Sequence, residues 1–153
     1  APSILNEEVG NWFELENISP YMLLVADVKK EIQITMTTEQ KNLFGIEKLN
    51  IKRSKIPAVT HVDYSSRIQT VHQETNPRYY KLIKKFNEIS GCPILVNTSF
   101  NIRGEPIVCS IKDAFRCFMG TNLDILVIEN LILYKSKQSN SLKKDYKNQF
   151  SLD

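Results

Sequence analysis

Residues Asn76–Val96 carry the clearest structural pattern of the chain and read NPRYYKLIKKFNEISGCPILV. Its apolar side chains recur at spacings of three and four residues, a pattern that predicts an amphipathic helix with one stripe facing the core. The residues of this stripe are Tyr79, Leu82, Ile83, Phe86 and Ile89. Asn76 suits the N-cap, Pro77 the first helical position and Gly91 the position just past the end. The apolar run Cys92–Val96 follows at once and predicts a short buried strand.

On either side of these residues, four further apolar runs predict strands and another segment predicts a second helix. The strands are Tyr21–Val28, which we expect to be buried, Val59–Val71, Asp124–Glu129 and Leu131–Lys135, with a tight turn at Glu129-Asn130. The helix begins at Ser110, where Ser-Ile-Lys-Asp suggests a capping arrangement. Residues Ala1–Ser19 show a short helical pattern. The order β-β-α-β-α-β-β predicts an α+β (α/β) protein in which helices pack on a mixed sheet within a single domain.

The composition argues against several classes of protein. The chain has 153 residues, of which 42% are hydrophobic and 24% charged, with a net charge of +3, as in an ordinary globular domain. Its longest apolar run, Pro20–Ala26, is far shorter than a membrane helix, and no leader of the secretory type opens the chain. The sequence pI of 8.7 lies below that of a typical DNA-binding domain. We therefore expect a cytoplasmic protein with no membrane partner and no nucleic-acid partner.

Several features are expected to be structural. The polar segment Glu31–Lys55 predicts a peripheral excursion, within which Arg53 belongs to a solvated charge run. His72 follows a predicted strand without an evident partner, and the polar, lysine-rich chain from Ser136 onward predicts a frayed tail. The spacing of the cysteines matches no metal site, so we expect reduced thiols and no metal site in this chain. These cysteines are Cys92, Cys109 and Cys117.

The densest chemistry lies in the segment NTSFNIRGEP, which spans residues 97–106. A buried strand that ends in these residues brings hydroxyl and amide groups to the carboxyl end of a sheet, where ligands of α/β folds bind. Thr98 and Ser99, together with exposed backbone N–H groups, are suited to cradle phosphate oxygens, and Arg103 offers a planar, charged fork for phosphate. The alternative, which the composition leaves equally open, is a turn-rich loop whose Asn and Ser side chains satisfy their own backbone.

A second cluster of polar residues lies near the start of the strand predicted at Val59–Val71. Alternate residues of a strand share one face. The polar residues that this alternation brings together are His61, Asp63, Ser65 and Arg67. The plainer interpretation is a solvated face with an Asp63–Arg67 ion pair worth about 0–1 kcal/mol, and the residues alone favour it. We exclude a Ser-His-Asp hydrolase, because there is no Gly-x-Ser-x-Gly motif and because His61 and Asp63 lie too close on one strand.

These stretches resemble a known family. The segments IPAVTHVDYSSRIQTV (56–71), NPRYY (76–80) and CPILVNTSFNIRGEPIV (92–108) closely resemble the C-terminal domain of the O-carbamoyltransferases, which include the nodulation-factor and tobramycin carbamoyltransferases. The segments Ala1–Leu5 and Ser19–Leu23 match it too. The resemblance implies one carbamoyltransferase C-terminal domain over residues 1–135, with residues 31–55 as a peripheral insertion, followed by a polar tail over residues 136–153.

The resemblance also implies a fold and a reaction. This domain of the family is YrdC-like, a twisted mixed sheet with a concave, positively charged face, and the segment at 97–106 is similar to the Ser-Thr-Ser-Ala-Asn signature of YrdC-type threonylcarbamoyl-adenylate synthases. Carbamoyl phosphate would supply carbamate, which attacks the α-phosphate of Mg-ATP to give carbamoyl adenylate and pyrophosphate. A Kae1-like N-terminal domain with its own metal site, present in cis or in trans, would pass the carbamoyl group to an acceptor hydroxyl. The implied ligands are therefore ATP, its Mg²⁺ ion and carbamoyl phosphate.

The same resemblance implies a set of substrate-binding residues, none of which is a nucleophile. These residues are His61, Ser65, Arg67, Asn97, Thr98, Ser99, Asn101 and Arg103. Within the set we expect Arg67 and Ser99 to contact phosphate groups and Arg103 to neutralise or frame the site. The amides and the Thr98 hydroxyl would orient the ligand. Nucleotidyl transfer depends mainly on positioning and charge neutralisation, which such groups supply.

The sequence departs from the family pattern in two ways, and both bear on the activity that we expect. The family carries a Lys-x-Arg-Glu-x-x-Arg-Pro-Phe stretch immediately before Ala-Pro-Ser, and that stretch adds phosphate-binding cations. The sequence starts at Ala1 and contains neither this stretch nor the Kae1-like domain. We therefore expect weak nucleotide binding and incomplete carbamoyl transfer. The alternative is a non-catalytic nucleotide-binding or regulatory module that retains the fold.

Overall fold

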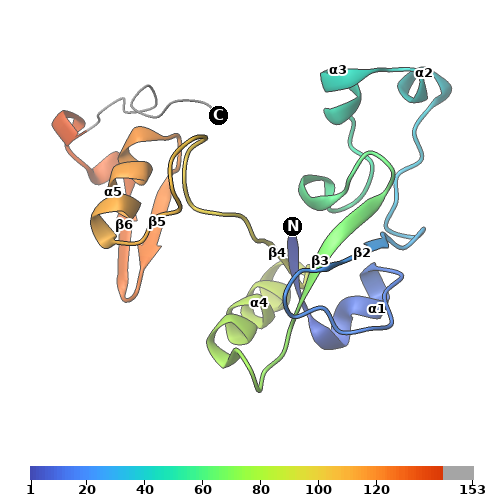
Figure 1. Cartoon of the computed structure of the whole chain (residues 1–153), viewed down its shortest axis with the longest axis horizontal. Helices are drawn as coiled ribbons and strands as arrows, with labels where there is room; N and C mark the ends of the chain where they lie inside the picture. The colour runs from blue at the N-terminus through green and yellow to red at the C-terminus, as the bar shows by residue number, and fades with distance from the viewer. Residues whose placement is uncertain (143–153) are drawn as a thin grey trace. The chain divides into compact units, whose positions relative to one another are not determined.

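The computed structural model describes residues 1–142, which form two compact units (Figure 1). The first unit is Ala1–Asn97, and the second begins at Thr98. The first unit contains a four-stranded sheet and the second a two-stranded hairpin. Helices accompany both, so the predicted α+β class with a mixed sheet is confirmed.

The sheet of the first unit has the order β2-β3-β1-β4. Its strands are β1 (Pro2–Leu5), β2 (Leu24–Asp27), β3 (Ser65–Val71) and β4 (Ile94–Val96). β1 runs parallel to β3, with Ser3 opposite Gln69, and antiparallel to β4, with Ser3 opposite Leu95. β2 pairs with β3 in the antiparallel sense and forms an edge of the sheet.

The register divides the apolar side chains of this sheet between its two faces. Ile4, Ile68 and Ile94 lie at alternating positions on one face and join Phe13 and Val28 in one core. On the opposite face, buried Leu5 and Val71 pack against Tyr80 and Ile83 of helix α4 (Pro77–Ser90). Figure 1 shows α4 lying along the strands of this unit.

Helix α4 confirms the predicted helix and both of its ends. The Asn76 side chain accepts a hydrogen bond from the Tyr79 N–H, and Gly91 adopts the left-handed conformation at φ 71°. The apolar stripe is only partly used, because Ile83 is fully buried whereas Leu82 is 57% and Ile89 is 77% exposed. The strand that follows has only three residues, so the last turns of the helix have little sheet to pack on.

Other expectations for the first unit are wrong. Residues Pro2–Leu5 form a strand rather than helix, and only Val9–Trp12 (α1) continues the expected helical pattern after a 3₁₀ turn. The predicted buried strand is β2, but its position at the sheet edge leaves Val25 58% exposed.

The peripheral segment carries two short helices, α2 (Thr38–Lys41) and α3 (Gly45–Leu49), and another 3₁₀ turn (Pro57–Val59) precedes β3. Arg53 is 4% exposed rather than solvated. Its guanidinium donates hydrogen bonds to the carbonyls of Lys48 at 2.5 Å and Leu49 at 3.3 Å. Arg53 therefore satisfies carbonyls that the end of α3 leaves without helical partners.

The second unit consists of α5 (Ile111–Gly120) and the hairpin of β5 (Ile125–Ile128) and β6 (Leu131–Tyr134). The Ser110 side chain caps α5 by accepting from the Asp113 N–H, as predicted. The tight turn is confirmed as well, with Glu129 at φ 51°.

The core of the second unit joins α5 to β5 through Phe118, Met119 and Leu126. Beyond β6, two 3₁₀ turns (Lys135–Lys137 and Asn140–Leu142) occupy the start of the predicted tail, and residues 143–153 of that tail lie outside the described residues. In the described part of the chain, every helix is too short or too polar to span a membrane.

Candidate anion-binding site

The face of the first sheet that α4 covers is apolar at one end and polar at the other. Arg67, Gln69 and Val71 alternate along β3 and therefore share this face. Val71 is buried against α4, whereas Arg67 is exposed. Within residues 1–142, the Arg67 guanidinium makes no hydrogen bond or ion pair with another side chain or carbonyl. An uncompensated, always-charged fork on an open face is suited to an anion.

Gln69 connects Arg67's face to the neighbouring strands. Its Oε1 accepts hydrogen bonds from the Ser3 hydroxyl at 2.5 Å and from Asn97 Nδ2 at 2.8 Å, and its Nε2 donates to the Pro20 carbonyl at 3.1 Å. Asn97 is thereby held on the same face as Arg67. Ser3 and Gln69 were not among the expected site residues, although Gln69 stands two positions from Arg67 in a predicted strand. Their partnership depends on the register between β1 and β3, which no local pattern reveals.

The predicted alignment of polar residues at the start of β3 is wrong in part, because the strand begins at Ser65. His61 and Asp63 lie instead in a turn in which Tyr64 adopts φ 68°. The Ser65 hydroxyl donates to Asp63 Oδ1 at 2.7 Å and lies 2.9 Å from His61 Nδ1, while the Ser65 N–H donates to the same carboxylate at 3.0 Å. No ion pair links Asp63 to Arg67 among the described residues. Ser65 therefore braces the turn next to Arg67.

These contacts define the charge state of the turn. The hydrogen bonds from the Ser65 hydroxyl and N–H stabilise the carboxylate and hold the pKa of Asp63 below its ordinary value. Because Ser65 gives its proton to Asp63, that proton is not directed to the imidazole of His61. The arrangement differs from a nucleophilic triad, in which the histidine accepts the serine proton. His61 itself is exposed.

The loop at the start of the second unit presents unused hydroxyl groups and a cation. Thr98, Ser99 and Arg103 are all exposed. Within the described part of the chain, neither the two hydroxyls nor the Arg103 guanidinium has a hydrogen-bond or ion-pair partner. These are the groups that phosphate binding would require.

Other side chains of the same loop fix its shape. Asn101 Nδ2 donates to the carbonyls of Glu105 at 2.7 Å and Ile102 at 3.1 Å. The buried Glu105 carboxylate accepts from the Ile102 N–H at 3.1 Å and from Arg116 at 3.0 Å. Gly104 supplies the φ of 80° that the turn needs. Asn101 thus holds the loop with its amide nitrogen and retains its carbonyl oxygen for other contacts.

The expected residues are divided between the two units. His61, Ser65, Arg67 and Asn97 belong to the first, and the other four belong to the second. The second group comprises Thr98, Ser99, Asn101 and Arg103. That the two groups converge on one ligand stays a prediction, as do their individual roles.

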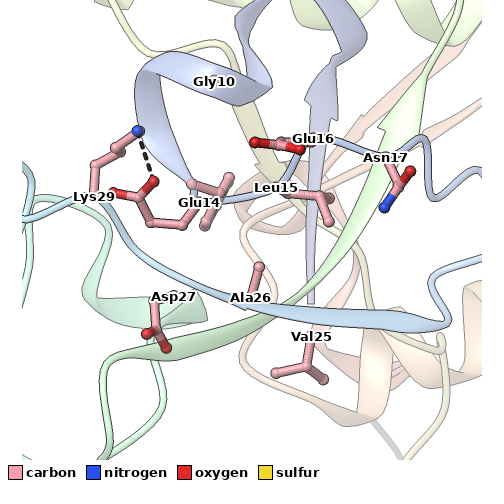
Figure 2. A pocket seen from close by; sticks show the side chains of 10 residues that line it. Gly10, Glu14, Leu15, Glu16, Asn17, Val25, Ala26, Asp27 and Lys29 are labelled. Atoms are coloured by element: carbon pink, nitrogen blue, oxygen red, sulfur yellow. Dashed lines mark hydrogen bonds and ion pairs between the residues drawn. The ribbon is translucent and has the colours of Figure 1, made fainter.

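A pocket of about 720 Å³ at the outer edge of β2 has the opposite electrostatic character (Figure 2). Glu14, Glu16 and Asp27 line it, and Lys29 Nζ pairs with Glu14 Oε2 at 2.7 Å. These carboxylates disfavour a phosphate. Nor do the described residues contain a cluster of three His, Cys, Asp or Glu side chains that could hold a metal ion.

Comparisons with known proteins point to one family. The family described as Carbamoyltransferase C-terminus matches residues 1–135. The chain is 58% identical to a Synechocystis sp. protein described as uncharacterized protein sll1178, over 100% of this chain and 25% of that protein. It is 37% identical to nodulation protein NolNO of Sinorhizobium fredii, over 91% of this chain and 18% of that protein. It is 31% identical to 3'-hydroxymethylcephem-O-carbamoyltransferase of Amycolatopsis lactamdurans, over 74% of this chain and 18% of that enzyme. The chain thus spans a quarter or less of the length of these relatives.

Proposed function

Since this chain belongs to the carbamoyltransferase C-terminal family, we propose that it binds ATP and carbamoyl phosphate and forms carbamoyl adenylate. The observation that carries the proposal is the Arg67 guanidinium, which lies exposed and unpaired within the described residues beside the Gln69–Asn97 pair. A Kae1-like domain, in cis or in trans, would then transfer the carbamoyl group to an acceptor hydroxyl. The relative named a cephem O-carbamoyltransferase supports a hydroxyl acceptor for the whole protein.

The proposed reaction needs no side-chain nucleophile. Water cleaves carbamoyl phosphate to carbamate and inorganic phosphate. A carbamate oxygen then attacks the α-phosphorus of ATP, the bond from that phosphorus to the oxygen bridging it to the β-phosphorus breaks, and pyrophosphate leaves. Arg67 neutralises phosphate charge, and Asn97 orients the ligand. Such positioning and charge neutralisation are the main protein contributions to nucleotidyl transfer.

The second unit would contribute through its loop. The Thr98 and Ser99 hydroxyls would donate to phosphate oxygens, and Arg103 would add a second guanidinium. Asn101 and Glu105 would hold the loop in shape through the hydrogen bonds described above. Mg²⁺ enters as part of Mg-ATP, bound by the phosphates. The cations and hydroxyls of these residues fit the phosphate oxygens rather than the metal ion.

Calorimetry tests the proposal with Mg-ATP and with carbamoyl phosphate, on this chain and on a version extended by the family's Lys-x-Arg-Glu-x-x-Arg-Pro-Phe stretch. Arg67→Ala should weaken Mg-ATP binding by about ten-fold or more, the loss expected for one charge-assisted hydrogen bond. Ser99→Ala should weaken it less. Lys52→Ala and Ser136→Ala are matched controls, since both residues are exposed and belong to no candidate site.

Two outcomes would count against the proposal: no binding of either ligand by the extended version, or binding that neither Arg67→Ala nor Ser99→Ala changes. Catalysis is measured separately, as exchange of labelled pyrophosphate into ATP in the presence of carbamoyl phosphate. Binding without exchange would instead indicate the non-catalytic module.

A further inference from the structure

The first step of the proposed reaction releases a proton that no residue has yet been assigned to receive. The oxygen of water forms a bond to the carbonyl carbon of carbamoyl phosphate, and the bond from that carbon to the bridging oxygen breaks. The products are carbamate, inorganic phosphate and one proton. A base that takes this proton from the attacking water would accelerate the step. Among the expected substrate-binding residues, His61 is the one whose side-chain type changes charge near neutral pH.

The turn that carries His61 is fixed to the start of β3 by hydrogen bonds. The His61 N–H donates to the Ser65 carbonyl at 2.8 Å, and the His61 carbonyl accepts from the Tyr64 N–H at 3.1 Å. The Nδ1 atom of the ring lies 2.9 Å from the Ser65 hydroxyl oxygen. The backbone bonds therefore fix the turn, and the side-chain bond fixes one edge of the imidazole.

The protons of this cluster determine which nitrogen of the imidazole is basic. A serine hydroxyl donates one hydrogen bond and accepts two, whereas a carboxylate only accepts. The Ser65 hydroxyl donates to Asp63 Oδ1 at 2.7 Å. That bond and the one from the Ser65 N–H hold the pKa of Asp63 below its ordinary value, so Asp63 is a carboxylate at neutral pH. The Ser65 oxygen must then accept from the ring, so Nδ1 carries a proton and neutral His61 has its lone pair on Nε2.

The basic nitrogen lies near the exposed guanidinium of Arg67. His61 is exposed, and its Nε2 has no hydrogen-bond partner within residues 1–142. Ser65, which holds the ring, and Arg67 stand two positions apart on one face of β3, a separation of about 7 Å along the strand. This separation leaves room for a carbamoyl group and one water molecule between the guanidinium and the imidazole.

We propose that His61 is the general base of this step, with Nε2 taking a proton from the water that attacks carbamoyl phosphate held at Arg67. The inference rests on the proposed function and adds to it the residue that receives the proton. The second step, the attack of carbamate on ATP, releases no proton and so does not require His61. This difference between the two steps makes the role of His61 separable from a role in folding.

Nitrogen-15 NMR of the 153-residue chain measures the tautomer directly, at alkaline pH where both imidazoles are neutral. The chain has two histidines, so His72→Gln leaves one set of imidazole signals and assigns it to His61. In the unsubstituted chain, neutral His61 should carry its proton on Nδ1. Ser65→Ala removes the acceptor of that proton and should raise the fraction of the Nε2–H tautomer, whereas Ser65→Thr keeps a hydroxyl and should not.

Catalysis is measured as exchange of labelled pyrophosphate into Mg-ATP, on this chain and on the extended version, with two alternative donors. The donors are carbamoyl phosphate and carbamate itself, supplied as ammonium carbamate. His61→Gln should lower the exchange that depends on carbamoyl phosphate by about 100-fold or more, the scale of a lost general base, and retain the exchange that depends on added carbamate. Arg67→Ala should lower the exchange with both donors. Lys52→Ala, the exposed control, should lower neither.

The outcomes distinguish this inference from the proposed function. A proton on Nδ1 of neutral His61, together with a loss in His61→Gln that is confined to carbamoyl phosphate, supports the general base. A neutral ring protonated on Nε2, or an effect of His61→Gln that is equal for the two donors, overturns the general base and leaves the proposed function standing. An unsubstituted protein that exchanges pyrophosphate with neither donor, with or without the upstream stretch, overturns the proposed function and the general base with it.

Discussion

The two ends of one face of β3 differ in what covers them. At the Val71 end, α4 lies over the strand and buries Val71 together with Leu5 and Ile83. At the Arg67 end, the same face is open, and its polar side chains are either linked to one another or unpaired within the described residues. Alternation alone assigns both ends to one face. The helix, rather than the strand, therefore separates the part of the face that stabilises the fold from the part available to a ligand.

The largest loss of stability is expected at the side chain that α4 buries against the sheet. Ile83→Ala should lower the free energy of unfolding by about 2–5 kcal/mol, because it removes apolar contacts and leaves a cavity. Ile89→Ala, on the same helix but at a side chain 77% exposed, should change it by less than about 0.5 kcal/mol. Chemical denaturation monitored by circular dichroism compares the two. Equal effects would mean that α4 does not cover the Val71 end as described.

An intermediate loss of stability is expected at Gln69, which lies between the Arg67 end and the Val71 end of the β3 face. Gln69→Ala removes three hydrogen bonds, to Ser3, Asn97 and Pro20, and should lower the free energy of unfolding by about 1–2 kcal/mol. The same denaturation experiment measures it. Double-mutant cycles of Gln69→Ala with Asn97→Ala should give a coupling energy above zero, since the two side chains share one bond. Strictly additive losses would show that the pair is not formed in solution.

The sequence was sufficient wherever a local pattern specified the structure. Capping residues and apolar spacing predicted α4 and its ends, and the Glu129-Asn130 turn predicted the second-unit hairpin. β1 was missed because four residues carry too little pattern, and its pairing partner β3 lies more than 60 residues away. The burial of Arg53 was missed for a similar reason, because the carbonyls that it caps belong to a helix of only five residues.

The candidate site was predictable to a similar extent. Strand alternation placed Arg67 on a polar face, and resemblance to a family selected it as a phosphate ligand. Neither signal identified Gln69 or Ser3, whose importance comes from the alignment of separate strands. His61 was placed wrongly on the strand, because the left-handed turn at Tyr64 is not encoded by a glycine. The sequence therefore did not determine which distant segments of the chain contact one another.

A smaller effect is expected at the turn that precedes Arg67. Ser65→Ala removes the hydroxyl that lowers the pKa of Asp63, so an NMR titration should find that pKa closer to its ordinary value. A lowered pKa in the folded state stabilises the fold above the ordinary carboxyl range, near pH 4. Ser65→Ala should therefore have a lower free energy of unfolding than the unmodified protein at neutral pH. This difference should shrink as the pH falls through the folded pKa of Asp63. An unchanged Asp63 pKa in this variant would contradict the hydrogen bond.

The smallest effect on stability is expected at the residue on which the proposed function depends. Arg67→Gln keeps a long polar side chain on the open end of β3 and removes only the charge, which has no partner within the described residues. The free energy of unfolding should change by less than about 0.5 kcal/mol, while Mg-ATP binding weakens. In the same denaturation experiment, Gln69→Ala should lower the free energy of unfolding by about 1–2 kcal/mol. The two variants therefore distinguish an exposed ligand-binding charge from a structural amide two residues away. A loss above 1 kcal/mol in Arg67→Gln would mean that the guanidinium supports the fold, and the contrast between the two ends of β3 would then no longer identify a binding face.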